Sequence, residues 1–104
     1  MKIILFLSLL FSFHVYASYS QDSGIVSQVY VNPNGSIALK LESGFPNALS
    51  SNQCENNNGW AGLSASDPVV KSVIIAAKTS GQTLKVTIEG CEGRWFKIKD
   101  LYLQ

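Results

Sequence analysis

Alternation of apolar and polar side chains predicts four strands in this chain. It is most regular at 36–42, where one face has Ile37, Leu39 and Leu41 and the other has Ser36, Lys40 and Glu42. A period of two is typical of a strand with one buried face. The segments 24–32, 83–89 and 95–103 alternate in the same way. Their expected inward residues are Ile25, Val29 and Val31, then Leu84, Val86 and Ile88, then Phe96 and Ile98.

Turn sequences separate these strands. Residues 32–35 (Asn-Pro-Asn-Gly) combine residues that tolerate positive φ with a proline that presets the entry, so the first two strands should form a hairpin. Residues 90–93 (Gly-Cys-Glu-Gly) are expected to turn the chain between the last two strands.

The last strand changes its apolar parity in the middle. After Ile98 the apolar positions move to Leu101 and Leu103, and Lys99 and Asp100 stand between them. This shift predicts a β-bulge, which bends a strand as closure of a barrel requires.

A helix is predicted over residues 68–80. Asp67 can cap the free amides, Pro68 suits the first helical position, and Gly81 suits the C-terminal stop. Its β-branched residues have low helix propensity, so burial against the sheet must stabilise it. The apolar face at helical spacing is Val69, Val70, Val73, Ile74, Ala76 and Ala77.

The segment 43–66 is polar and rich in Ser, Asn and Gly. A structureless loop of this length is unusual in a compact domain, so we expect a short third strand inside it. Two placements remain open, 51–56 and 60–63.

The resulting order is strand, strand, strand, helix, strand, strand. That is the order of the five-stranded OB-fold. The sequence therefore predicts a mainly β fold with one helix (α+β), in the form of an OB-fold-like barrel.

The N-terminal residues 1–17 read as a secretory signal peptide. Lys2 precedes an apolar stretch, and residues 15–17 (Val-Tyr-Ala) resemble a signal-peptide cleavage site of the A-x-A kind. Cleavage is therefore expected after Ala17. A membrane anchor is the competing interpretation, but a spanning helix needs about 20 apolar residues and this run is shorter. We expect an exported protein, secreted or periplasmic, with one domain at 18–104 and no membrane span after cleavage.

Two cysteines, Cys54 and Cys91, are present. In an oxidising compartment they should form a disulfide bond, although two free thiols are the alternative. Two cysteines without a histidine in 18–104 are too few ligands for a zinc site. No metal or other cofactor is expected.

Charge and catalytic residue types exclude several functions. Lys2 belongs to the leader, which leaves seven basic against seven acidic side chains, and this balance argues against nucleic acid as the partner. The single histidine, His14, also lies in the leader, so no imidazole base remains. Glu89 and Glu92 flank Cys91 and are interpreted as solvent-facing charges. The sequence predicts that the protein is not an enzyme.

Four residues are candidate binding residues. Trp60 and Phe45 lie in the polar linker, where an exposed aromatic ring can stack on a sugar or a base. For Trp60 the alternative is that it plugs the end of the barrel. Trp95 has the parity opposite to Phe96 and neighbours Arg94, so it can be a contact anchor or simple packing.

Residues 67–103 resemble the second half of the B subunits of bacterial AB5 toxins, notably the subtilase-cytotoxin and pertussis-like group. The similar segment begins with IIAAKTSGQTLKVTI (74–88), which covers the end of the predicted helix and the strand after it. Gly90-Cys91 and a final apolar strand follow. The resemblance implies the OB-fold and recognition of cell-surface glycans by a ring of five copies. It carries over no individual binding residue.

Together these observations predict an exported, non-enzymatic binding module, similar to a toxin B subunit, that recognises surface glycans. The alternative is a periplasmic protein that binds another protein, as an immunity or inhibitor protein does. The expected partner is thus a glycan or a protein, and homo-oligomerisation stays open.

Overall fold

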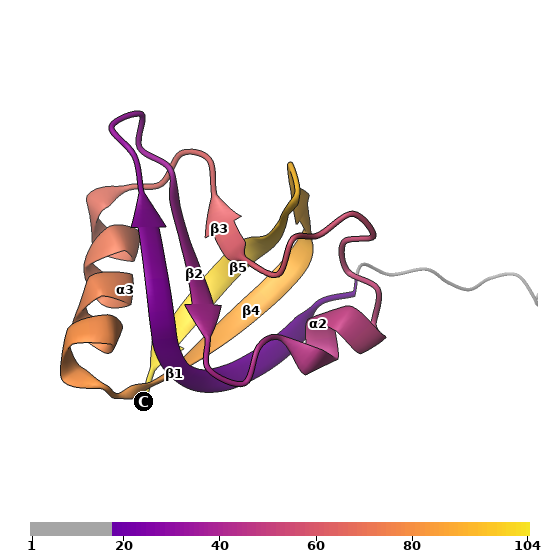
Figure 1. Ribbon diagram of the computed structural model, residues 1–104, viewed down its shortest axis with the longest axis horizontal. Coiled ribbons are helices and arrows are strands. Elements are labelled where there is room, and N and C mark those ends of the chain that lie inside the picture. The colour runs from indigo at the N-terminus through magenta and orange to yellow at the C-terminus, as the bar shows by residue number, and fades with distance from the viewer. Residues whose placement is uncertain (1–17) are drawn as a thin grey trace, which may run out of the picture.

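The computed structural model describes residues 18–104, and the expected signal peptide lies outside the described residues. The described chain forms five strands and two helices (Figure 1). The strands are β1 (Ser20–Val31), β2 (Ile37–Leu41), β3 (Ala61–Leu63), β4 (Thr83–Glu92) and β5 (Trp95–Leu103), and the helices are α2 (Pro46–Ser50) and α3 (Pro68–Ser80).

The five strands make one sheet that closes into a ring in the order β1-β2-β3-β5-β4. The long strand β1 pairs with β4 through its first half and with β2 through its second half, both antiparallel. The ring is completed by a short parallel pairing of β3 with β5. The predicted mainly β fold, with five strands and a helix between the third and the fourth, is confirmed.

A β-bulge in β1 overturns part of the expected core. The pairing register with β2 shifts between Val26 and Gln28, so one extra residue stands in β1. Because a bulge changes which residues point inward, Val26 is buried and Val29 packs against the core. The predicted inward residues Ile25 and Val31 were wrong: Ile25 is only half-buried and Val31 is 54% exposed.

The bulge expected in β5 is present. Thr87 pairs with Asp100 and Ile88 pairs with Ile98, which leaves Lys99 without a partner in β4. Leu101 packs against the core as the shift predicted. Leu103 does not, since it is exposed.

The turn between β4 and β5 is tighter than predicted. β4 continues through Glu92, and a second register shift occurs between Ile88 and Cys91. Gly90 has φ of +78° there, a conformation that glycine adopts without steric cost. The turn itself consists of Gly93 and Arg94.

The ends of α3 are as the sequence predicts. The Val70 N–H donates to the Asp67 carboxylate at 3.0 Å, and the N–H of Gly81, at φ of +72°, donates to the Ala77 carbonyl. The apolar face is narrower than expected: Ile74 and Ala77 are buried, whereas Val69 is 70% exposed. Ala76 is also exposed, so both lie on the solvent side of the helix.

The linker between β2 and β3 holds a helix that the sequence did not predict. The amides of Asn47 and Ala48, in the first turn of α2, donate to the two carboxylate oxygens of Asp22 at 2.9 and 3.1 Å. Asp22 lies on β1 and is only 5% exposed, so the cap comes from a distant part of the chain. The third strand is β3, in the second of the two predicted placements, and the placement at 51–56 was wrong.

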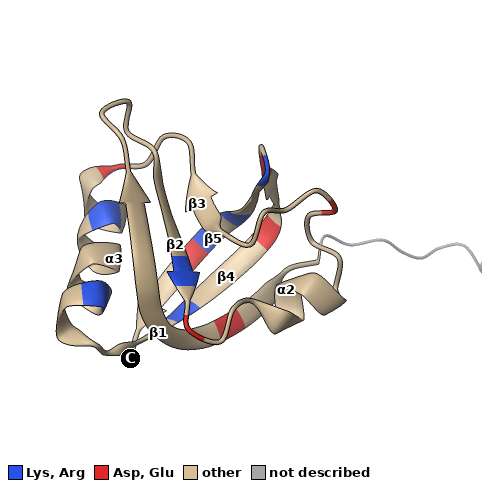
Figure 2. Cartoon of the chain, in the orientation of Figure 1, with Lys and Arg blue, Asp and Glu red and all other residues tan. Residues whose placement is uncertain are grey.

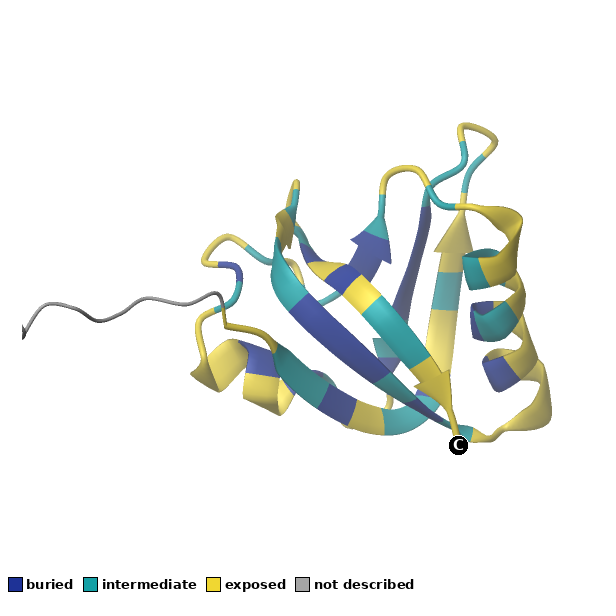
Figure 3. Ribbon diagram, turned by 180° about the vertical axis from the view of Figure 1, so that it is seen from behind, coloured by how far each residue is buried: buried dark blue, intermediate teal, exposed yellow. Residues whose placement is uncertain are grey.

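The core fills the inside of the ring. Phe96 of β5 and Phe45 of the linker lie at its centre, with ring centroids 5.8 Å apart. Figure 3 shows the buried stretch of β4 and the exposed outer side of α3. The other fully buried apolar residues of this core are Ile37, Leu39, Ala48, Ala61, Ile74, Ala77, Leu84, Val86 and Ile88.

The predicted disulfide bond between Cys54 and Cys91 is present, with their Cα atoms 5.1 Å apart. It joins the linker to the end of β4. Hydrogen bonds run beside it: the Gly90 N–H donates to the Gln53 side chain at 3.0 Å. The linker is therefore fixed to the β4–β5 hairpin.

Candidate functional site

Three aromatic rings gather on the outer surface of the sheet. Tyr30 of β1, Trp60 just before β3 and Trp95 of β5 form this aromatic cluster, and a hollow of about 250 Å³ lies between them. The Tyr30 ring centroid is 6.5 Å from that of Trp60 and 6.0 Å from that of Trp95, both in edge-on arrangements. Such pairs are favoured by the ring quadrupoles.

Small residues make room for the aromatic cluster. Ala38 of β2 lies opposite Tyr30 on one side and Gly62 of β3 on the other. It is fully buried although it does not belong to the core cluster inside the ring. A Cβ atom at Gly62 would lie 2.6 Å from Trp95 Cε3 and 2.5 Å from the Ile37 carbonyl oxygen. The Trp95 indole therefore lies directly on the backbone of β3.

Gly62→Ala should disturb the aromatic cluster and the sheet together. The added methyl group meets backbone as well as side chain, so it cannot be relieved by one rotamer change, and overpacking of this kind costs about 1–3 kcal/mol. Both tryptophans belong to the cluster, so a shift in tryptophan emission should accompany a lower melting temperature. Gly24→Ala is the control, because its nearest neighbour is the movable Ser43 hydroxyl at 3.1 Å. Unchanged emission and melting for Gly62→Ala would contradict the placement of Trp95.

Lys40 adds a positive charge to the cluster. Its Nζ atom lies 5.1 Å from the centroid of the Trp60 ring. This cation–π contact places a hydrogen-bond donor beside an aromatic face.

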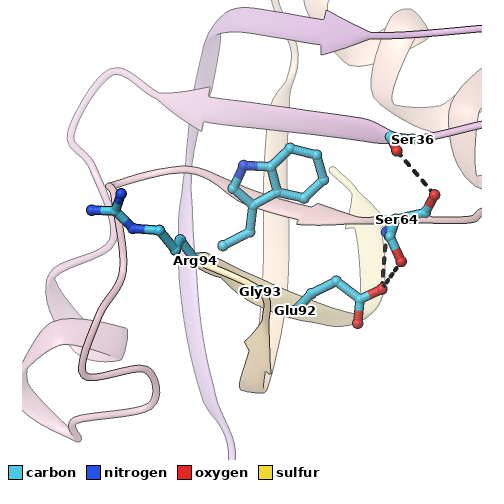
Figure 4. A pocket seen from close by; sticks show the side chains of 6 residues that line it. Ser36, Ser64, Glu92, Gly93 and Arg94 are labelled. Atoms are coloured by element: carbon cyan, nitrogen blue, oxygen red, sulfur yellow. Dashed lines mark hydrogen bonds between the residues drawn. The ribbon is translucent and has the colours of Figure 1, made fainter.

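A polar pocket of about 520 Å³ adjoins the aromatic cluster. It lies between the start of β2, the end of β3 and the β4–β5 turn, and Trp95 lines both hollows (Figure 4). Its lining residues are Ser36, Ser64, Glu92, Gly93, Arg94 and Trp95.

Glu92 is held in place at one end of this polar pocket. The backbone N–H of Ser64 donates to Glu92 Oε2 at 2.9 Å, and the Ser64 hydroxyl donates to the same oxygen. Ser36 in turn donates its hydroxyl to the Ser64 carbonyl at 3.0 Å. The side-chain and backbone hydrogen bonds from Ser64, with help from the charge of Lys97, outweigh the effect of partial burial and lower the pKa of Glu92 from its ordinary value. The carboxylate is therefore ionised at neutral pH.

Arg94 marks the other end of the polar pocket. Figure 4 shows the side chains of Arg94 and Glu92 extending in opposite directions. The Arg94 Nε atom donates to the Asn56 carbonyl at 3.4 Å. The pocket thus has an acceptor end and a donor end, with an indole ring shared with the neighbouring hollow.

The linker segment that carries Trp60 is fixed on the hairpin that carries Trp95. The Phe96 N–H donates to the Trp60 carbonyl and the Asn58 N–H donates to the Arg94 carbonyl, both at 2.9 Å. The disulfide bond closes the same junction. A site held this way loses little conformational freedom on binding.

Three of the four predicted binding residues meet at this surface: Trp60, Trp95 and Arg94. Phe45 does not, since it is 2% exposed and packs on Phe96 inside the ring. Trp60 does not plug the barrel, because its half-buried ring lies beside Tyr30 and Lys40 on the outer surface.

Sequence reasoning missed the partners of these residues. Tyr30 is the exception, since it has the parity opposite to the apolar residues of its strand and is a weaker candidate of the same kind as Trp95 from the sequence. Glu92, interpreted as a solvent-facing charge, is only partly covered, and its carboxylate also accepts hydrogen bonds from Ser64, which the sequence did not indicate. Nothing local in the sequence connects Ser36 and Ser64 with Glu92.

Acidic and basic residues are interspersed along β4 and β5, and the charged residues of α3 are two lysines, Lys71 and Lys78 (Figure 2). Within residues 18–104 no group of three or more His, Cys, Asp or Glu could hold a metal ion. None of the helices in that same range has the length and apolarity needed to cross a bilayer. Comparison with protein-family models, curated proteins and solved structures finds no match for the chain.

Proposed function

We propose that the chain is an exported, non-enzymatic OB-fold module that binds carbohydrate across the aromatic cluster and the polar pocket. The ring order β1-β2-β3-β5-β4, with a helix between β3 and β4, supports the OB-fold assignment. OB-folds bind oligonucleotides and oligosaccharides on the face of strands 2 and 3, between the β1–β2 and β4–β5 loops. The aromatic cluster and the polar pocket lie in this region of the barrel.

The observation that carries the proposal is that an aromatic surface and a polar pocket lie side by side and share one lining residue, Trp95. A sugar ring has C–H groups on its faces and hydroxyl groups around its edge. The C–H groups pack well on the electron-rich face of an indole, and the hydroxyl groups need donors and acceptors nearby. Here Glu92 and Ser64 offer acceptors at one end, and Arg94 and Lys40 offer donors.

The disulfide bond and the leader-like residues 1–17 support export. The resemblance of residues 67–103 to toxin B subunits supports glycan recognition as the role, with assembly into a ring as part of the same proposal. The balanced charge of residues 18–104 supports a neutral or mixed ligand over nucleic acid.

A protein partner is the second candidate function. Trp, Tyr and Arg are the residue types most enriched at the energetic centres of protein interfaces, and the aromatic cluster with Arg94 contains all three. The polar groups of Glu92, Ser64 and Arg94 beside the aromatic rings suit the hydroxyl groups at the edge of a sugar, which favours the carbohydrate.

Trp60→Ala and Trp95→Ala should each weaken carbohydrate binding by about 10- to 100-fold. The loss of one stacked ring costs about 1–3 kcal/mol where bases stack on aromatic residues, and a sugar face should lose a similar amount. Binding is measured on a glycan array and then by calorimetry with the best ligand. Tyr102→Ala is the matched control, since Tyr102 is an exposed aromatic of β5 outside both hollows. Equal binding by all three variants would place the site elsewhere.

A further inference from the structure

We infer that Glu92 makes the site selective for neutral sugars, because its free carboxylate oxygen accepts hydrogen bonds from neighbouring hydroxyls and rejects a sugar carboxylate. The inference rests on the carbohydrate binding proposed above and names the class of sugar that the site takes.

The first step is the hydrogen bonding of the carboxylate. Ser64 donates twice to Oε2, while Oε1 has no hydrogen-bond partner among residues 18–104. The carboxylate is therefore fixed in position with one oxygen still able to accept. Two adjacent hydroxyl groups of a sugar can both donate to such an oxygen, which has two lone-pair directions.

The second step is the position of Glu92 relative to the indole. Glu92 and Trp95 face each other across the end of the β4–β5 hairpin, where they are a cross-strand pair, and both line the polar pocket. A sugar ring that packs on Trp95 thus presents its edge toward Glu92. The hydroxyl groups of that edge would be the ones that donate hydrogen bonds to the Glu92 carboxylate.

The third step is the sign of the charge. A sugar carboxylate placed against Glu92 would bring two like charges close together, and such charges repel each other, more so where the bound sugar displaces water between them. An acidic sugar therefore loses affinity whenever its carboxylate enters the Glu92 end. Two cations lie near this carboxylate. Arg94 extends away from Glu92 and its Nε atom donates to the Asn56 carbonyl (Figure 4). Lys97, whose charge also acts on Glu92, does not line the pocket, so neither cation meets a sugar carboxylate at the Glu92 end.

The test uses an array that prints neutral hexoses and N-acetylhexosamines beside their uronic-acid and sialylated counterparts. The natural chain should bind its best neutral glycan at least about 10-fold more tightly than the acidic counterpart. Glu92→Gln keeps the shape and an acceptor oxygen for Ser64 but removes the charge, so this ratio should fall toward one. Glu42→Gln, an exposed carboxylate just after β2, is the control and should leave the ratio unchanged.

Each outcome decides between the two proposals. Tight binding of acidic glycans by the natural chain, or an unchanged ratio in Glu92→Gln, overturns the role of Glu92 and leaves carbohydrate binding intact. A natural chain that binds no glycan overturns the proposed function itself. A role of Glu92 in folding alone would lower the melting temperature of Glu92→Gln and weaken both glycan classes equally, which also overturns the inference.

Discussion

Replacing both Cys54 and Cys91 with alanine should lower the melting temperature by roughly 15–30 °C. The two residues are 37 positions apart, and closing a loop of this length stabilises a fold by about 4 kcal/mol in the chain-entropy account. A domain of this size changes its melting temperature by about 4–8 °C for each kcal/mol. The effect is large because a small domain has a thin stability margin.

Circular dichroism melts of the double variant and of the natural chain, each with and without a reductant, measure this contribution. The reductant should destabilise the natural chain and leave the variant unaffected, which separates the bond itself from the loss of two side chains. Cys54 is buried, so part of the change in the variant comes from a lost core contact. Equal melting of the natural chain in both buffers would show that the bond contributes little.

The same bond holds the linker that positions Trp60. Below its melting temperature, the double variant should therefore bind carbohydrate more weakly than the natural chain, because the Trp60 segment would then be held to the β4–β5 hairpin without a covalent bond, by hydrogen bonds alone. If the proposed function holds, the disulfide bond should contribute to binding through preorganisation as well as to stability.

The parts of the fold that the sequence predicted correctly are those whose signals are local. Asp67, Pro68 and Gly81 mark the ends of α3 by backbone chemistry that needs no other part of the chain. The bulge at Lys99 was visible because apolar and polar residues alternate clearly on both sides of it. In β1 the apolar pair Ile25–Val26 suits either face, so the bulge there left no trace in the pattern.

The elements that the sequence missed depend on contacts between distant segments. The helix α2 is capped by Asp22, and no feature of residues 46–50 reveals this partner. The site is assembled from β1, the linker, the end of β4 and β5, so each strand contributes only one or two residues. Trp60 and Trp95 were predicted from residue type and parity, but the small residues Ala38 and Gly62 that accommodate them gave no signal.

Phe45→Ala should destabilise the fold by about 3–5 kcal/mol, the cost of truncating a buried phenylalanine. The sequence offers Phe45 and Trp60 as equivalent aromatic residues of one polar linker, whereas the structure places Phe45 against Phe96 inside the ring. The two alanine variants should therefore differ in which property they lose. Phe45→Ala should lose stability, and Trp60→Ala should lose binding with little change in its melt.

Chemical denaturation measures the free energy of unfolding of Phe45→Ala, Phe96→Ala and the double variant. Aromatic pairs in contact couple by about 0.5–1.5 kcal/mol beyond their burial, so the double variant should lose less than the two single losses combined. Phe45→Leu keeps most of the apolar volume and provides a measurable variant if the alanine form does not fold. A Phe45→Ala variant that stays stable but loses carbohydrate binding would indicate that Phe45 lies on the surface. It would contradict the packing of the linker inside the ring of strands.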